Sequence, residues 1–361
     1  MGTASRGAIA FVSETSVVDA PPDDPVEMAE RAGLDYVSDS EPGFTRRRRG
    51  RGFSYHRTDG SLVRSPRELE RIQKLAVPPA WTDVWTCANP CGHVQATGRD
   101  ARGRKQYRYH ERWREVRDEN KFGLLASFGH GLPPLRDRLD GELRAPGLSR
   151  QKVLALVIRL LDETLIRIGN REYVDDNETY GLTTVTNDHV DVGWRSATFE
   201  FVGKGGGDHL VTVDDGRLAR IISRCHELGG QALFSYREDG DIRSINSSDV
   251  NDYLREVVGP AVTAKHFRTW GGTVTAAEYL AILDPPGSES EAAAAEIQAI
   301  DEAASQLRNT RAVSRRCYVH PAILDAYRDG SLAEEWKRAR TIGQLRRAER
   351  AVLAVLDNGS A

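Results

Sequence analysis

The sequence predicts an α+β protein in which a small β-rich N-terminal domain precedes a larger, mainly α-helical domain that carries a β-hairpin. Short apolar runs separated by Gly and Pro fill the first third of the chain, whereas apolar residues at three- and four-residue spacing dominate the rest. A chain of 361 residues also exceeds one average domain. We expect an acidic tail at residues 1–25, a β-rich domain at 26–118 and a helical domain at 119–361.

The first 25 residues are polar, acidic and contain three prolines, which favours a disordered tail. In the β-rich domain that follows, Gly and Pro separate short apolar runs, and a basic loop interrupts the last pair of runs. The expected elements are strands at 53–55 and 84–86, a turn at 58–61, a helix at 66–75, and a hairpin of 94–97 and 106–109 around a basic loop at 98–105.

The clearest helix of the second domain begins at Ser149, a favourable N-cap residue. It carries apolar residues at helical spacing as far as Ile168, and Gly169 is its expected stop. A glycine-rich turn at 203–207 joins two short strands and predicts a mobile hairpin tip. The other expected elements are those two strands at 197–202 and 209–213, helices at 217–228, 248–257 and 275–282, and an acidic, Ala-rich segment at 284–304 that starts as a linker.

The charges of the chain are segregated, although its net charge is only −3. Residues 1–43 hold nine acidic and two basic side chains, whereas residues 44–117 hold eighteen Lys or Arg and seven Asp or Glu. A solvated basic face is one explanation of such a segment. An excess of eleven positive charges is more typical of a surface that binds a polyanion, so we expect a nucleic-acid partner.

Other classes of protein are disfavoured. No apolar run approaches the roughly 18 residues that span a bilayer, and the first residues lack the pattern of a signal peptide. We therefore expect no membrane partner and a cytoplasmic location. Cys87 and Cys91 lack a second Cys or His pair at zinc spacing, so no metal is expected. Gly203-Lys204 lacks the flanking residues of a phosphate-binding P-loop, so no nucleotide cofactor is expected either.

Several isolated basic residues stand beside glycines, and a basic segment near the C-terminus ends in a tyrosine. Arg167 lies two residues before a glycine, Lys204 lies within the glycine turn, and Arg268 precedes Trp-Gly-Gly. Tyr318 ends a segment that starts at Asn309. Converging cations stabilise charge during phosphoryl transfer, and a tyrosine hydroxyl can hold the phosphoryl group covalently. Taken singly, each residue has a simpler explanation as a helix-dipole partner, a solvated lysine or a core tyrosine.

Five ordered blocks together resemble the signature blocks of type IB DNA topoisomerases of the compact bacterial and poxvirus-like kind. They are Arg-Ile-Gly at 167–169, Asn-Glu-Thr-Tyr-Gly-Leu at 177–182, Phe-Val-Gly-Lys at 201–204, Phe-Arg-Thr-Trp-Gly at 267–271 and Ser-Arg-Arg-Cys-Tyr at 314–318. The basic block at 97–109 resembles the end of that family's N-terminal DNA clamp. The resemblance implies a monomeric, nucleoid-associated enzyme whose two domains close around double-stranded DNA and relax it without ATP, metal or cofactor.

The resemblance also implies a role for each motif residue. Tyr318 would attack the scissile phosphate and leave a 3′-phosphotyrosyl enzyme, while Arg167 and Arg268 would bind the non-bridging oxygens. Lys204 would protonate the departing 5′-oxygen. The family normally has a histidine nine residues before the tyrosine, where this chain has Asn309, which can donate a hydrogen bond but carries no positive charge. The DNA-binding residues expected in the clamp are Arg99, Arg102, Arg104, Lys105, Gln106, Tyr107 and Tyr109.

Two other functions stay open at this point. A tyrosine recombinase uses the same nucleophile, but recombinases typically show His three residues before the second arginine, where this chain has Lys265. A catalytically inert DNA-binding protein would use only the basic clamp, and would have no need of the arginines, lysine and tyrosine together. Relaxation of supercoiled DNA in a chelator separates the three functions.

Overall fold

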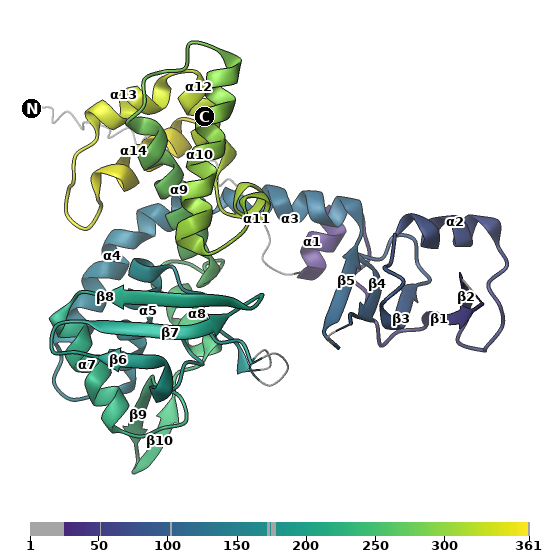
Figure 1. Cartoon of the computed structure of the whole chain (residues 1–361), viewed down its shortest axis with the longest axis horizontal. Helices are drawn as coiled ribbons and strands as arrows, with labels where there is room; N and C mark the ends of the chain where they lie inside the picture. Colours follow the sequence, from purple (N-terminus) through teal and green to yellow (C-terminus); the bar gives the residue numbers. More distant parts are fainter. Residues whose placement is uncertain (1–24, 51, 102, 172–173, 175–177, 360–361) are drawn as a thin grey trace, which may run out of the picture.

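The computed structural model describes residues 25–50, 52–101, 103–171, 174 and 178–359 (Figure 1). The acidic tail expected at 1–25, apart from Pro25, and Arg102 lie outside the described residues. A small N-terminal domain and a larger, mainly helical body are joined by helix α3 (Glu111–Gly123). The domain boundary expected after residue 118 falls inside this helix.

The N-terminal domain is an antiparallel sheet of five strands in the order β2-β1-β3-β4-β5. The expected strands, turn, helix and hairpin are present, and helix α2 packs Ile72 against Phe44 of strand β1. Strand β1 was not expected, because four consecutive arginines hide the alternation that marks a strand. The elements are α1 (Pro25–Arg31), β1 (Gly43–Arg49), β2 (Gly52–His56), α2 (Pro66–Lys74), β3 (Thr82–Cys87), β4 (Val94–Arg99) and β5 (Lys105–Tyr109).

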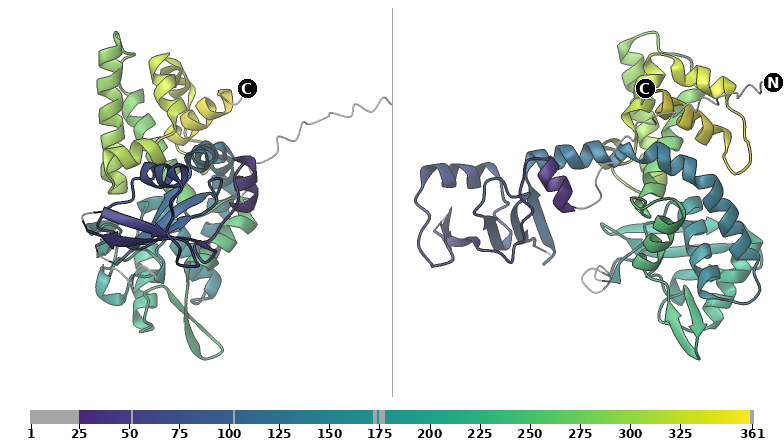
Figure 2. Two further views of the ribbon diagram at one scale, coloured as in Figure 1. Left: turned by 90° about the vertical axis from the view of Figure 1, so that its right-hand side faces the viewer. Right: turned by 180° about the vertical axis from the view of Figure 1, so that it is seen from behind.

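The larger body has one continuous hydrophobic core, with helix α5 at its centre and a small sheet, β6-β7-β8, beside it (Figures 1 and 2). No described helix combines the length and the apolar character needed to cross a bilayer. Its helices are α4 (Leu125–Arg144), α5 (Arg150–Thr164), α7 (Gly216–Glu227), α8 (Ser247–Val257), α9 (Lys265–Ala281), α10 (Glu289–Leu307), α11 (Arg311–Cys317), α12 (Pro321–Arg328), α13 (Ser331–Arg338) and α14 (Arg347–Asn358). Its remaining elements are the 3-10 turn η1 (Asn187–His189) and strands β6 (Val190–Val192), β7 (Ala197–Gly203), β8 (Gly207–Val213), β9 (Ser235–Glu238) and β10 (Asp241–Ser244).

The expected end of one helix and the expected start of another are wrong, and in both cases tertiary packing explains the difference. Helix α5 stops at Leu165, which has the left-handed φ of 55°, so Gly169 is not its stop. Gly169 instead packs against Gly181 so closely that a Cβ on Gly181 would lie 2.5 Å from the Gly169 backbone. Helix α9 begins ten residues earlier than the expected start at residue 275, so the glycines that follow Trp270 lie inside the helix. The acidic segment at 284–304 is a linker only to residue 288, and then becomes helix α10.

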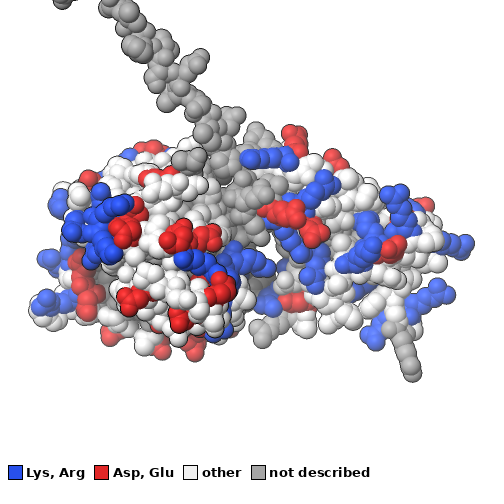
Figure 3. All heavy atoms as spheres, turned by 90° about the horizontal axis from the view of Figure 1, so that it is seen from above, with Lys and Arg blue, Asp and Glu red and all other residues white. Residues whose placement is uncertain are grey.

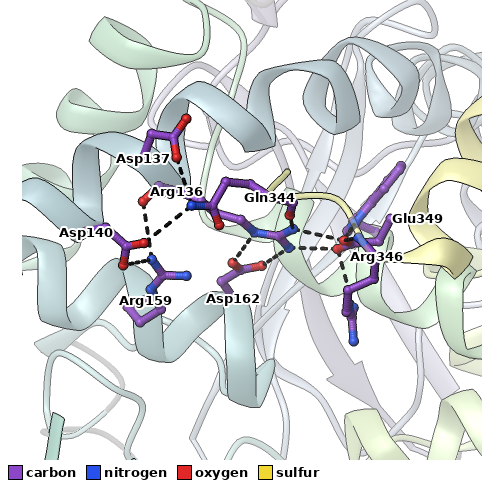
Figure 4. A network of polar contacts seen from close by, with 9 residues as sticks. Arg136, Asp137, Asp140, Arg159, Asp162, Gln344, Arg346 and Glu349 are labelled. Carbon is purple, nitrogen blue, oxygen red and sulfur yellow. Dashed lines mark hydrogen bonds and ion pairs between the residues drawn. The ribbon is translucent and has the colours of Figure 1, made fainter. Parts of the chain in front are cut away.

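A buried ion-pair network ties helix α14 to the helices beneath it (Figure 4). Arg136 of α4 binds Asp162 of α5 at 2.7 Å and Glu349 of α14 at 2.7 Å. Trp270 of α9 donates its indole N–H to the same Glu349 carboxylate at 3.2 Å. Burial favours the neutral carboxylic acid, but the Arg136 guanidinium outweighs it and lowers the pKa of Glu349 to about 2. The network therefore holds α9 in place through Trp270, two residues after Arg268 in the first turn of that helix.

Candidate active site

Arg167 lies on the short segment that leaves helix α5. The backbone around it is held by the segment that contains Gly181, because the Leu182 N–H donates to the Arg167 carbonyl at 2.8 Å. The close contact of Gly169 with Gly181 leaves no room for a side chain at either position. Two of the sequence blocks that suggested the family, 167–169 and the described part of 177–182, therefore pack against each other and set the path of the Arg167 backbone. Asn177 lies outside the described residues.

Arg268 is nearly fully buried in the first turn of α9, with 4% of its surface exposed. Its guanidinium donates to the carbonyl of Leu165 and, at 2.8 Å, to the carbonyl of Leu307. These carbonyls belong to the ends of α5 and α10, where a helix leaves carbonyl groups without intrahelical partners. Burial, and to a lesser extent the charge of Arg167, lower the pKa of Arg268 to about 10, so it remains a cation near neutral pH.

Tyr318 follows helix α11, and its ring lies against Arg268, with the guanidinium carbon 5.1 Å from the ring centre. Its backbone is fixed by Thr273 of α9, whose hydroxyl donates to the Tyr318 carbonyl at 3.1 Å and accepts the His320 N–H at 3.1 Å. Burial alone would raise the pKa of the Tyr318 hydroxyl. The positive charge of Arg268, with smaller contributions from other cations nearby, outweighs burial and lowers that pKa below its usual value.

Asn309 lies between α10 and α11 and joins this group through Arg167. The Arg167 Nη2 atom donates to Asn309 Oδ1 at 2.6 Å. Among the described residues, Arg167 Nη1, Arg268 Nε and Asn309 Nδ2 are buried donors without a hydrogen-bond partner. Buried donors are rarely left unpaired. Three of them together, beside a tyrosine of lowered pKa, form a site that suits an anionic oxygen.

Lys204 lies at the exposed tip between β7 and β8. The tip turns through Gly205 and Gly206, whose φ angles of 90° and 81° belong to the left-handed region that glycine adopts without strain. In Figure 1 the tip extends toward the side of the body on which the N-terminal domain lies. The structure thus gathers Arg167, Arg268, Asn309 and Tyr318 and presents Lys204 on a neighbouring hairpin.

Arg308, which was not expected from the sequence, connects this hairpin to the rest of the site. Its guanidinium donates to the carbonyl of Asp208 at 2.9 Å and to the carbonyl of Leu210, both on β8. No sequence motif marks Arg308, and only its place before Asn309 could have drawn attention to it. His209 is buried on β8 and stacks on Phe201 with ring centres 4.9 Å apart.

The basic residues expected to contact DNA lie on the β4–β5 hairpin, and ion pairs hold several of them. Arg104 binds Asp100 at 2.7 Å, and Lys105 binds Asp39 at 2.7 Å. Arg99 is more exposed and lies 4.0 Å from Asp83. Figure 3, which views the molecule from above, shows more basic than acidic side chains on the visible side of the N-terminal domain.

The uncharged residues of the same hairpin differ in exposure. Gln106 donates to Asp100 at 3.1 Å. Tyr107 is 44% exposed and stacks on Tyr109, with ring centres 5.8 Å apart. Tyr109 itself is partly buried and packs against the small apolar clusters that contain Trp113 and Val94. Tyr107 is therefore available to a ligand, whereas Tyr109 also supports the domain core.

Comparison with known proteins finds similarity along most of the chain. The family model of the eukaryotic DNA topoisomerase I catalytic core matches residues 110–344, and that of the bacterial DNA topoisomerase IB N-terminal domain matches residues 52–100. DNA topoisomerase 1B of Acanthamoeba polyphaga mimivirus is 31% identical over 295 residues, which cover 80% of this chain and 88% of that protein. DNA topoisomerase 1B of Vaccinia virus (strain Copenhagen) is 21% identical over 269 residues, which cover 72% of this chain and 82% of that protein.

Proposed function

Since this chain belongs to the type IB DNA topoisomerase family, we propose that it relaxes supercoiled duplex DNA by cutting one strand through a covalent bond to Tyr318. As a DNA topoisomerase it is an enzyme that acts on DNA. The observation that carries the mechanism is the cluster of buried donors without partners on Arg167, Arg268 and Asn309, beside the Tyr318 hydroxyl of lowered pKa. A scissile phosphate bound there would satisfy these donors.

In the proposed cleavage step, the Tyr318 oxygen attacks phosphorus and the Tyr318 proton passes to solvent. A bond forms between the Tyr318 oxygen and phosphorus, and the bond between phosphorus and the 5′-oxygen breaks. The electron pair of the broken bond leaves with the 5′-oxygen, which takes a proton from the Lys204 ammonium group. Arg167 and Arg268 stabilise the negative charge on the non-bridging oxygens.

Resealing is the reverse reaction, in which the 5′-hydroxyl attacks the 3′-phosphotyrosine and returns its proton to Lys204. The phosphotyrosine conserves the energy of the phosphodiester bond, so the cycle needs no ATP. Between the two steps the free 5′ end rotates and releases supercoils. The side-chain cations supply the positive charge that other phosphoryl-transfer enzymes take from magnesium.

The two domains would act as a clamp around the duplex. The basic β4–β5 hairpin would contact phosphates from one side and the body would contact them from the other, with helix α3 as the connection. Contacts to phosphates position a protein on DNA without reading its sequence. The clamp therefore accounts for affinity, and the Tyr318 cluster accounts for chemistry.

The test is relaxation of positively and negatively supercoiled plasmids by purified protein in EDTA and without ATP. We expect both substrates to be relaxed, and a denaturant quench to trap Tyr318 on the 3′ end of the cut strand. Tyr318→Phe is the matched control and should give neither product. A strict requirement for magnesium, or a trapped complex that survives in Tyr318→Phe, would overturn the proposal. DNA binding without relaxation would favour an inert binder, and strand exchange would favour a recombinase.

A further inference from the structure

We propose that Arg308 is a positioning residue, which holds the β7–β8 hairpin at the distance from the phosphate site that Lys204 needs for proton transfer. The inference rests on the proposed function, because it presumes that Lys204 is the proton donor. Arg308 itself touches neither the phosphate nor the leaving oxygen. Its contacts are with the backbone of the strand that follows the hairpin tip.

Arg308 binds the free edge of strand β8. Strand β8 is an edge strand of the three-stranded sheet, so one row of its carbonyls faces away from β7. Asp208 and Leu210 are two residues apart on that edge, and their carbonyls both accept from the Arg308 guanidinium. A planar guanidinium can bind both at once, whereas a lysine ammonium is a single point charge. Arg308 therefore fixes the strand within four residues of Lys204.

The position of Arg308 in the chain also links the hairpin to the phosphate site. It stands between Leu307, whose carbonyl accepts from Arg268, and Asn309, whose side chain accepts from Arg167. Three consecutive residues thus contact the two arginines of the phosphate site and the strand behind Lys204. A displacement of the hairpin from this junction would displace Lys204 from both arginines together.

The backbone conformation of Arg308 is unusual for an arginine. It ends helix α10 with a left-handed φ of 49°, where glycine or asparagine is the usual residue. A residue with a side chain is strained in that conformation. The helix dipole favours a cation at this end, but it does not favour arginine over lysine. The two carbonyl contacts on β8 do, because the left-handed turn is the point from which the side chain reaches that strand.

One face of the strand is also fixed. His209, between the two bound carbonyls, stacks on Phe201, and a Cβ on Gly203 would lie 2.4 Å from its ring. Burial, together with the charges of Arg308, Arg167 and Arg268, lowers the pKa of His209 to about 4, so its ring is uncharged at neutral pH. The base of the hairpin is therefore packed on one face and bound by Arg308 at its edge.

The experiment compares two substrates in single-turnover cleavage, one with the natural 5′-oxygen and one with sulfur in its place. A thiolate leaves without a proton, so a variant that has lost only proton donation recovers on the sulfur substrate. We expect Arg308→Ala to cleave the oxygen substrate roughly 10- to 100-fold more slowly, as a small misplacement of a catalytic group does. On the sulfur substrate its rate should approach that of the wild type. In a Lys204→Ala background, Arg308→Ala should cause no further loss on the oxygen substrate.

Arg311→Ala is the matched control, because Arg311 is a cation three residues away that pairs with Asp301 on the surface. It should cleave both substrates at the wild-type rate. Arg308→Lys keeps the charge but loses the planar fork of donors. Its cleavage rate on the oxygen substrate should therefore lie between those of the wild type and Arg308→Ala. If Arg308→Ala fails to give a cooperative thermal unfolding transition, Arg308→Gln, which keeps an amide donor, takes its place.

An equal loss on both substrates would show that Arg308 stabilises the phosphate or binds DNA, and an unchanged rate would show no role in cleavage. Either result overturns the inference. Lys204→Ala in the same assay separates this failure from failure of the proposed function. If sulfur rescues Lys204→Ala but not Arg308→Ala, only the positioning role is wrong. If sulfur rescues neither variant, the proton donor itself has been assigned wrongly.

Discussion

The acidity of Tyr318 depends on two opposing features of its surroundings. Burial raises the pKa of the hydroxyl, while Arg268, Arg167 and Lys265 lower it, and the cations prevail. The reactive form is the phenolate, so the cleavage rate should rise with pH until Tyr318 is deprotonated. Because the wild-type pKa is lowered, this rise should occur at a lower pH than an unperturbed tyrosine would give.

Arg268→Ala removes the largest effect that lowers this pKa and leaves burial unopposed. We therefore expect the rise in rate to move to higher pH, in addition to a loss of about 10²- to 10³-fold from the missing charge. The measurement is single-turnover cleavage across pH with the 5′-sulfur substrate, which removes the pH dependence of Lys204. Lys265→Ala should shift the profile in the same direction but less. An unshifted profile in Arg268→Ala would mean that the cation does not control the hydroxyl.

The side-chain amide of Asn309 has a hydrogen-bond partner for only one of its two polar atoms among the described residues. Its Oδ1 accepts from Arg167, while its Nδ2 has no partner among the described residues and is available to a phosphate oxygen. Asn309→Ala should slow cleavage by about tenfold to a thousandfold, and Asn309→His should keep most activity. Asn309→Asp keeps the acceptor for Arg167 but replaces the donor with a negative charge, so it should be at least as slow as Asn309→Ala. Wild-type cleavage rates in Asn309→Asp would exclude contact with the phosphate.

The residues of the site were predictable from the sequence because their types and order resemble known blocks, whereas their contacts were not. Arg167 and Asn309 are 142 positions apart, and Arg308 and Leu210 are 98 apart. Nothing local in the sequence relates such positions. Their roles in cleavage stay predictions. Arg308 went unnoticed because an arginine at a helix end has an ordinary explanation in the helix dipole.

Elements differed from expectation where packing overrides local propensity. The expected helix start at residue 275 left Gly271 and Gly272 outside the helix, but they lie inside α9, where neighbouring groups leave no space for a side chain. A Cβ on Gly271 would meet the Leu165 side chain, and one on Gly272 would lie 2.8 Å from the Tyr318 carbonyl oxygen. Glycine costs about 1 kcal/mol inside a helix. Here that cost permits the close approach of α9 to the segment that carries Tyr318.

Gly272→Ala should therefore affect the active site by altering the packing of α9 against the segment that carries Tyr318. The new methyl group must displace the Tyr318 backbone, so we expect a loss in cleavage rate of up to about 100-fold. Unfolding stability should fall by about 1–3 kcal/mol, as in an overpacked core. Gly141→Ala in α4 is the matched control, because nothing lies within 4 Å of its Cβ position. It should raise stability by about 0.5–1 kcal/mol and leave cleavage unchanged. Equal behaviour of the two variants in urea unfolding and cleavage would contradict this explanation.

At the scale of the whole molecule, the N-terminal domain and the body stand apart and are connected by α3 (Figure 2). The sequence indicated two domains and a basic N-terminal segment, because composition and charge segregate along the chain. It could not indicate that Asp39 and Asp100 form ion pairs with two of the basic side chains, since these pairs form only in the folded sheet. DNA phosphates would have to compete with these carboxylates for Lys105 and Arg104.

The clamp should control binding, while the Tyr318 cluster controls the chemistry. Arg99 is the more exposed cation of the hairpin, so Arg99→Glu should weaken binding to a duplex and reduce the dependence of log affinity on log salt concentration by about 1–2. Asp39→Asn should have the opposite effect, because it releases Lys105 from its ion pair.

Both changes are measured by fluorescence anisotropy across salt concentrations, with Lys337→Glu on helix α13 as a control that should leave binding unchanged. At saturating DNA, Arg99→Glu should cleave at the wild-type rate, because the hairpin supplies no group to the phosphate site. A slower rate in the bound complex would mean that the hairpin helps to assemble that site. Weaker binding by Asp39→Asn would mean that the ion pair orients Lys105 toward DNA rather than withholding it.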